Sequence, residues 1–353
     1  MEDINKFRFN FDRDVTALQK FNGATGKKIL FLALKAADKK PAVLQIIGDN
    51  YAAQIEGAAT DVLSKTADAI NYFYPDYGDI SMGMKWQATK KWNPDGDITA
   101  RTVIFYENSR VSTAFGKKDQ PLMDLFTLYH ETAHTLDNNK PGGDGKHPLP
   151  ENVGDAYAAM LMLRRFGQQA VPFLQKVSLW RAANFGFAQE EDHFTSITLD
   201  KIIADSAGQD FSKLNAADMF KRAKDYAGLW APPMADLEKS RQVYLHMERE
   251  PDPVGWLIAH SALSRYAPEN IAFYMAAKSV LPALDPALRT EKNRTFSAAE
   301  ISLAKRLMAK AATVKLSALF NAAATKAPAA KITLADMLTP GTPRTTKPRG
   351  LRT

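Results

Sequence analysis

The pattern with the clearest chemical meaning in this 353-residue chain is His-Glu-Thr-Ala-His, formed by residues 130–134. Apolar side chains recur around it at helical spacing, so we expect a helix here. Residues four apart on a helix emerge on the same face, and this places His130 beside His134. Two imidazoles on one face can bind a single zinc ion.

Glu131 follows His130 directly, so its carboxylate leaves the helix at a different angle from the two imidazoles. That direction lets it reach a zinc-bound water without displacing the water from the metal. A catalytic zinc keeps one position open, whereas a structural zinc does not. We therefore expect Glu131 to be a general base. Alternatively, the pattern is a chance match, and the two histidines are ordinary surface or core residues of an amphipathic helix.

The third ligand must be another His, Asp or Glu, because the chain has no cysteine. Metzincins have a glycine and a histidine three and six residues after the second histidine, and Asp137 and Lys140 stand there instead. We expect Glu151 to be the third ligand. Asp155, four residues later, can then accept a hydrogen bond from a ligating imidazole and fix its tautomer. Asp155 as the ligand itself is the open alternative.

A His-Glu-x-x-His helix followed by Glu-x-x-x-Asp on the next helix resembles the zincin superfamily and, within it, the glutamate-zincins, which include thermolysin-like peptidases. The resemblance covers residues 122–165. It implies two histidine ligands, a glutamate ligand and a glutamate general base at the positions named above. In the related aspartate-zincins, the residue at Asp155 would be the ligand.

The resemblance also implies an edge strand before the active-site helix, which would hold an extended substrate by strand addition, and residues 101–106 stand in that place. An ordinary core strand is the equal alternative for these residues. Zinc peptidases usually have a further side chain that stabilises the oxyanion. The polar segment 190–196 contains His193, which we expect in that catalytic role. A capping or surface histidine is the alternative for His193.

The expected fold class is α+β and predominantly helical, with a zincin-like catalytic core, a small antiparallel sheet and a helical C-terminal lobe. Strand-forming residues 80–89 and 100–106 flank a turn signal at 92–97 and predict a hairpin. Most of the first 75 residues are expected to be helical, although 29–34 could be strand or helix.

Two helices are expected to carry the site, at 121–138 and 150–165, and further helices to fill 171–325 between proline breaks. Four segments follow from this pattern. They are an N-terminal helical lobe with the small sheet (1–120), the active-site helices (121–185), a helical C-terminal lobe (186–325) and a basic disordered tail (326–353).

The net charge is +7, and the last fifteen residues supply four of these charges without any acid. The tail has no interleaved aromatic residues, so nucleic acid is an unlikely partner. We see neither a signal peptide nor an apolar run that could span a membrane. The expected location is the cytoplasm, or outside the cell after export without a cleavable signal, for example as a translocated bacterial effector.

Together these features predict a zinc metallopeptidase, most simply an endopeptidase, that hydrolyses a peptide or protein substrate by Glu131-assisted attack of a zinc-bound water. A zinc hydrolase acting on a non-peptide amide is the nearest alternative. A metal-binding or protein-interaction module without turnover is the alternative from another class.

Overall fold

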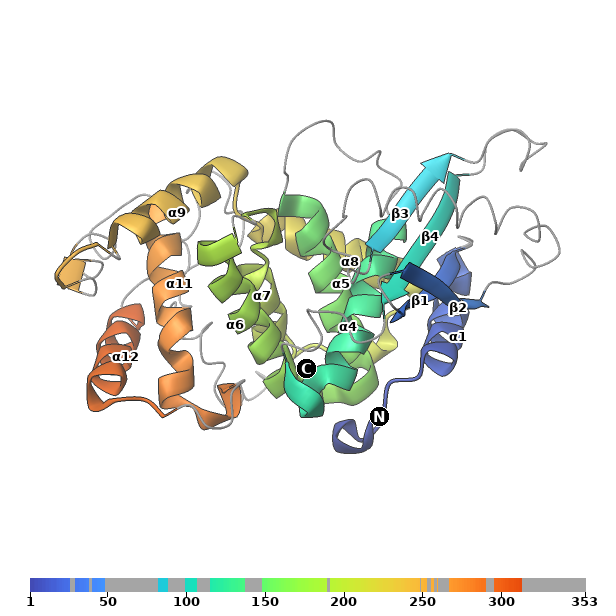
Figure 1. Ribbon diagram of the computed structural model, residues 1–353, viewed down its shortest axis with the longest axis horizontal. Coiled ribbons are helices and arrows are strands. Elements are labelled where there is room, and N and C mark those ends of the chain that lie inside the picture. Colours follow the sequence, from blue (N-terminus) through green and yellow to red (C-terminus); the bar gives the residue numbers. More distant parts are fainter. Residues whose placement is uncertain are drawn as a thin grey trace, which may run out of the picture. The chain divides into compact units, whose positions relative to one another are not determined.

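The computed structural model (Figure 1) describes residues 1–25, 29–37, 40–47, 82–87, 99–106, 115–136, 148–188, 191–247, 249–252, 255–256, 259, 267–289 and 295–312. Helices account for most of these residues. The chain forms two compact units, and each is described by itself. Unit 1 comprises residues 1–173 and 210–228, and unit 2 comprises 174–209 and 229–353.

Unit 1 contains four α-helices and four strands within the described residues. The helices are α1 (Phe11–Asn22), α4 (Gly116–Leu136), α5 (Pro148–Phe166) and α8 (Ala216–Trp230), the last of which extends past the boundary of the unit. Short 3-10 turns lie at Ile4–Lys6, Gly23–Thr25, Gly167–Ala170 and Phe211–Lys213. The strands are β1 (Leu30–Ala37), β2 (Lys40–Ile47), β3 (Met82–Gln87) and β4 (Thr99–Tyr106), in the order β2-β1-β4-β3.

The expected α+β class with a small antiparallel sheet is wrong, whereas the expectation of a predominantly helical chain is confirmed for the described residues. Helices dominate the described residues, and β1 and β4 run parallel at the centre of a mixed sheet, with Leu32 opposite Ile104. β1 and β2 also occupy part of the first 75 residues, which we expected to be mostly helical. A short apolar run such as 29–34 has no periodicity that separates strand from helix, and here pairing with distant β4 decides the outcome.

β4 contains residues 101–106, which the resemblance placed at a sheet edge. The strand pairs with β1 on one side and antiparallel with β3 on the other. The backbone groups of β4 are therefore hydrogen-bonded to a neighbouring strand on each side, and β4 has no free edge for an extended substrate. The expectation of a substrate-binding edge strand at 101–106 is therefore wrong, and the alternative of an ordinary core strand is confirmed, with Val103 and Phe105 fully buried.

α4 and α5 pack against each other and form the buried centre of unit 1. α5 is apolar on every side, and its residues from Asn152 to Leu163 are all buried. It ends where Gly167 adopts a φ of 60°, a left-handed conformation that favours glycine. α4 begins five residues before Pro121, earlier than predicted, and Gly116 starts it with a φ of 70°.

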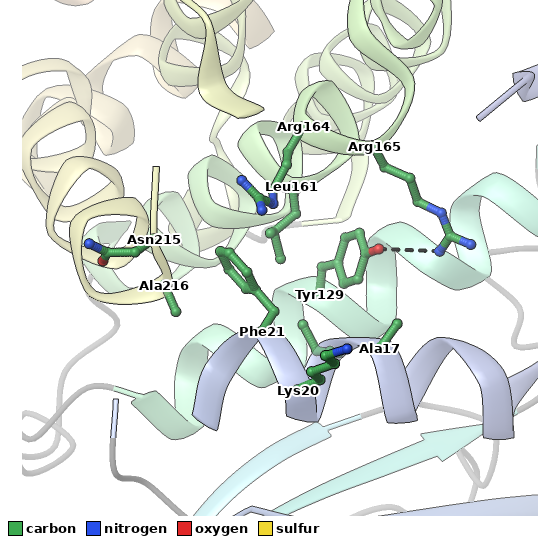
Figure 2. Close-up of a pocket in the computed structure, with 10 residues that line it drawn as sticks. Ala17, Lys20, Phe21, Tyr129, Leu161, Arg164, Arg165, Asn215 and Ala216 are labelled. Carbon is green, nitrogen blue, oxygen red and sulfur yellow. Dashed lines mark hydrogen bonds between the residues drawn. The ribbon is translucent and has the colours of Figure 1, made fainter. Parts of the chain in front are cut away.

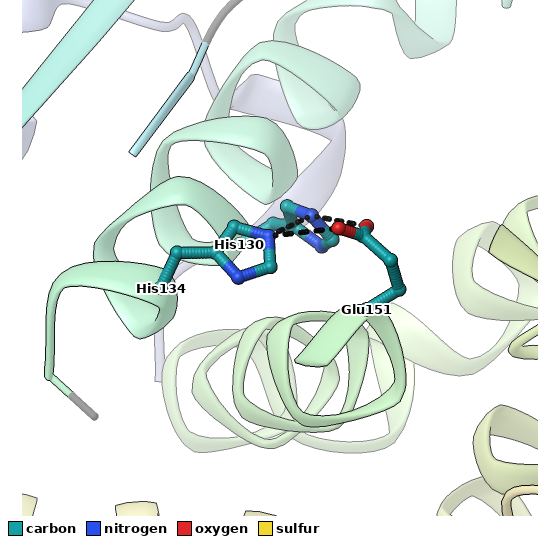
Figure 3. Close-up of side chains that lie close together, drawn as sticks. All are labelled: His130, His134 and Glu151. Carbon is teal, nitrogen blue, oxygen red and sulfur yellow. Dashed lines mark hydrogen bonds and ion pairs between the residues drawn. The ribbon is translucent and has the colours of Figure 1, made fainter. Parts of the chain in front are cut away.

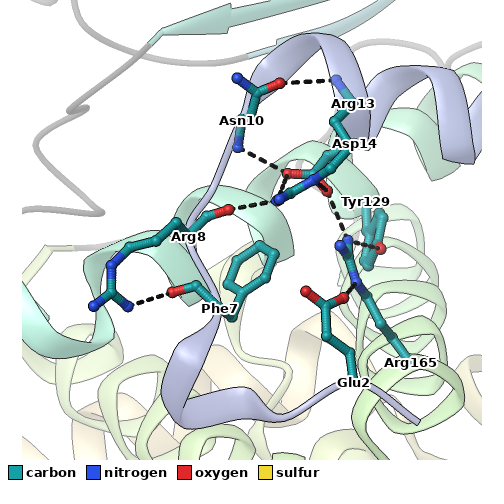
Figure 4. Close-up of polar contacts among 8 residues, drawn as sticks. All are labelled: Glu2, Phe7, Arg8, Asn10, Arg13, Asp14, Tyr129 and Arg165. Atoms are coloured by element: carbon teal, nitrogen blue, oxygen red, sulfur yellow. Dashed lines mark hydrogen bonds and ion pairs between the residues drawn. The ribbon is translucent and has the colours of Figure 1, made fainter.

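Arg165 joins the N-terminal segment and α1 to the end of α5 (Figure 4). Its Nε lies 2.6 Å from Glu2 Oε2, and its Nη1 lies 2.8 Å from Oδ1 of the fully buried Asp14. Asn10 caps α1 and its backbone N–H donates to Asp14. This network fixes α1 beside the helix that carries the candidate site.

Unit 2 is helical throughout its described part. It contains most of α6 (Val171–Ala188), then α7 (Ser196–Asp205), α9 (Met234–Met247), α11 (Ala267–Leu284) and α12 (Ala298–Ala311), with 3-10 turns at Glu191–His193 and Pro286–Leu288. A capping box formed by Ser297 and Glu300 starts α12. α11 runs through Pro282, where we expected a break.

Among the described helices, none is both long and apolar enough to cross a bilayer. Residues 48–75 of the region expected to be mostly helical, the turn at 92–97 and the basic tail at 326–353 lie outside the described residues. The division of the chain into four segments stays a prediction.

Candidate metal centre

His130 and His134 project from the same face of α4, one turn apart (Figure 3). Their Nε2 atoms are 2.9 Å from each other, and the two ring planes meet at 85°. His130 is buried, whereas His134 is partly exposed. The pair therefore presents two nitrogen atoms toward one point, reachable from the His134 side.

Glu151 reaches the same point from the first turn of α5 (Figure 3). Its Oε2 lies 3.1 Å from His130 Nε2, and its Oε1 lies 3.3 Å from His134 Nε2. One atom from each of the three residues can be chosen so that all lie within 4.8 Å of one another. A carboxylate is also favoured at this position, because the N-terminal end of a helix carries partial positive charge.

The spacing of these atoms suits a small tetrahedral cation. Zinc binds nitrogen at about 2.0–2.1 Å, which places two ligand atoms of a tetrahedron roughly 3.3 Å apart. The three separations in the cluster, 2.9, 3.1 and 3.3 Å, are close to that value. Two imidazoles and one carboxylate also form a ligand set typical of catalytic zinc.

Asp155 contacts the opposite side of the His130 ring. Its Oδ1 lies 2.6 Å from His130 Nδ1, and the Asp155 side chain is fully buried. An ionised carboxylate only accepts hydrogen bonds, so Nδ1 carries the proton and donates it. The neutral ring then has its lone pair on Nε2, the atom that faces Glu151 and His134.

The cluster perturbs its own protonation strongly. Burial lowers the pKa of His130, but attraction to Asp155, their hydrogen bond and the contacts with Glu151 outweigh it and raise the pKa to about 10. Burial raises the pKa of Glu151, but the two histidines, His134 first, hold it well below its usual value. Without a metal, His130 is therefore an imidazolium at neutral pH, protonated on both ring nitrogens, and Glu151 is ionised.

Gly154 allows the His130 ring to lie close to α5, and this residue was not among those predicted from the sequence. A Cβ at Gly154 would lie 2.7 Å from both Cε1 and Nδ1 of His130. The His130 ring thus lies directly against the backbone of α5. A glycine in the middle of a helix destabilises it by about 1 kcal/mol relative to alanine. Glycine at this position, just before Asp155, is the signal that could have revealed a close contact.

Replacing Gly154 by alanine is expected to push the His130 ring out of line with Asp155 and weaken zinc binding by about 10- to 100-fold. Competition with a chromophoric chelator measures that affinity. Gly228→Ala is the matched control, since Gly228 lies within α8 and a Cβ there meets no atom within 4 Å. Equal zinc affinity in the two variants would contradict the importance of this close approach.

Glu131 and His193 are the two residues expected to act in catalysis. Glu131 is buried on α4, next to His130 in the chain, and is not one of the three clustered residues. His193 belongs to unit 2, where it ends a 3-10 turn with Nδ1 3.1 Å from Asp192 Oδ1. Its side chain is about a third exposed, and its catalytic role stays a prediction.

Comparison of the chain with protein-family models, with curated proteins and with solved structures found no match. The assignment of a function therefore depends on the chemistry of the His130, His134 and Glu151 cluster itself.

Proposed function

We propose that this protein is a zinc-dependent metallopeptidase whose metal ligands are His130, His134 and Glu151. One observation carries the proposal: two Nε2 atoms and a carboxylate from separate helices converge at ligand spacing. The buried Asp155 on the far side of His130 supports it, because such a carboxylate orients a ligating imidazole. The likeness of His-Glu-x-x-His and Glu-x-x-x-Asp to the glutamate-zincins points to the same chemistry.

His130, His134 and Glu151 would hold a zinc ion, which would supply Lewis acidity that polarises a carbonyl and acidifies water. The chain's own residues supply the remaining steps. Glu131 takes the proton of the attacking water and later passes it to the leaving amine. Asp155 holds the proton on Nδ1 of His130 throughout.

Metal content and turnover together test this function. Purified protein is expected to contain about one zinc per chain, to lose it to a chelator and to cleave members of a peptide library only when zinc is restored. Zinc without cleavage of any peptide would indicate a metal-binding module instead. Failure to bind zinc at all would rule out both the metallopeptidase and the metal-binding module.

Zinc binding is expected to release about one proton between pH 7 and pH 9. His130, with its pKa near 10, is protonated in the metal-free cluster over this range and must lose the Nε2 proton to bind zinc. The affinity for zinc should therefore rise about tenfold per pH unit. Calorimetry in buffers with different ionisation enthalpies measures the proton count, and a count of zero would contradict the expected protonation.

The site of action belongs to the proposal as well. A chain without cysteine can fold in the same way in reducing and in oxidising surroundings. We propose that it acts in the cytoplasm or outside the cell after export. Cell fractionation, with detection of the intact chain, tests this.

A further inference from the structure

A cavity of about 610 Å³ lies among α1, α4, α5 and the start of α8, and none of the roles proposed above uses it (Figure 2). Lys20 and Phe21 come from α1, Tyr129 from α4, and Leu161 and Arg164 from α5. This volume is within the range of sites that take small organic molecules.

The lining of this cavity is strongly cationic. It includes Lys20, Arg164 and Arg165, and none of the lining residues carries a carboxylate. Arg165 is neutralised by its ion pairs with Glu2 and Asp14. Lys20 and Arg164, by contrast, form no ion pair with the residues that the structure describes. Two positive charges at the cavity therefore have no counter-charge from the described part of the chain.

The Arg164 guanidinium is held in place by contacts that do not neutralise it. Its Nη1 donates to the backbone carbonyls of Ser212 and, at 3.0 Å, of Leu214. Its Cζ lies 4.7 Å from the centroid of the Phe21 ring. A guanidinium fixed in this way keeps other N–H groups for a ligand, and their planar arrangement matches carboxylate and phosphate oxygens.

Apart from Asn215, the rest of the lining is apolar or aromatic, with Phe21 next to Arg164 and with Tyr129 and Leu161 also in the lining. We propose that this cavity binds a small organic anion, whose phosphate or carboxylate group pairs with Arg164 and Lys20 and whose apolar part packs against the aromatic and aliphatic lining. The anion supplies the missing counter-charge, and the apolar part accounts for the aromatic lining.

The cavity is separate from the metal cluster. Arg164 follows Glu151 by thirteen positions on α5, which is about 20 Å along the helix axis. Tyr129 precedes His130 directly on α4, so its side chain leaves the helix about 100° away from the metal-binding face. Ligand binding in the cavity therefore does not depend on zinc.

Phenyl phosphate and benzoate are suitable probes because each joins a ring to one anionic group, and phenol is the neutral control. Titration of the full chain, with and without zinc, is expected to show saturable binding of at least one anion in both states. Phenol should bind at least about tenfold more weakly, since it lacks the charge-assisted hydrogen bonds. The tighter of the two anions assigns the head group.

Lys20→Gln is expected to weaken binding of that anion by about tenfold, and Lys20→Glu should weaken it further. Lys20 is exposed, so these changes leave folding intact. Lys117→Gln, at an exposed lysine outside the cavity, is the matched control and should bind as the unmodified chain does. Arg164→Met tests the second charge, with circular dichroism to confirm folding.

Three results would overturn the proposal. They are the absence of binding by both anions, equal binding of phenol, and unchanged anion affinity in Lys20→Glu. Because binding is measured with and without zinc, its failure is distinct from failure of the metallopeptidase proposal.

Discussion

Glu131→Gln is expected to lower peptide hydrolysis by at least about 100-fold while leaving one zinc bound. General bases typically contribute 10²- to 10⁴-fold to a rate, and a glutamine amide cannot accept the proton of the attacking water. The metal should remain because Glu131 is not among the three clustered residues. Rates on a cleaved library peptide, with zinc content measured on the same sample, give both quantities.

Glu238→Gln is the matched control, since Glu238 is an exposed glutamate on α9 in unit 2. It should keep the full rate. Full activity in Glu131→Gln would rule out Glu131 as the general base, whereas loss of zinc from that variant would show that Glu131 supports the metal instead.

Lys278→Met is expected to lower the free energy of unfolding by about 3–5 kcal/mol, the usual cost of leaving one member of a buried ion pair alone. Lys278 and Asp200 are both almost fully buried in unit 2, with Nζ 2.5 Å from each carboxylate oxygen. Ser178 and Tyr274 also donate hydroxyl hydrogen bonds to Asp200. The variant leaves the carboxylate buried with hydroxyl donors only, and urea unfolding measures the loss.

Burial lowers the pKa of Lys278, although Asp200 opposes this. The second change Asp200→Asn should recover much of the lost stability in Lys278→Met, because asparagine removes the buried charge. Its carbonyl can accept from one of the two hydroxyl groups, and its amide can donate to the oxygen of the other. Lys221→Met, at an exposed position, serves as the control. A loss below about 1 kcal/mol in Lys278→Met would show that the pair contributes little.

Local patterns in the sequence contain much of the candidate site. A helical period places His130 above His134, and a period of four places Glu151 and Asp155 on one face of the next helix. The structure brings all four together. These positions can be predicted from the sequence because each depends on the geometry of one helix and on a single packing contact between neighbouring helices.

Other features depend on contacts between distant parts of the chain and have no such local signal. The parallel pairing of β1 with β4 joins segments about 70 residues apart, and it makes residues 101–106 a central strand. The Asp200–Lys278 pair spans 78 residues. Gly154 could be predicted only in part, because a glycine inside a helix indicates close packing but does not identify the residue that packs against it.

We expect His130, His134 and Glu151 to hold one zinc ion. Anomalous diffraction at the zinc edge from crystals of zinc-loaded protein tests this directly. One strong anomalous peak is expected about 2.0–2.2 Å from both Nε2 atoms and from a Glu151 oxygen. A peak bound by other residues, or none at this cluster in zinc-soaked crystals, would contradict it.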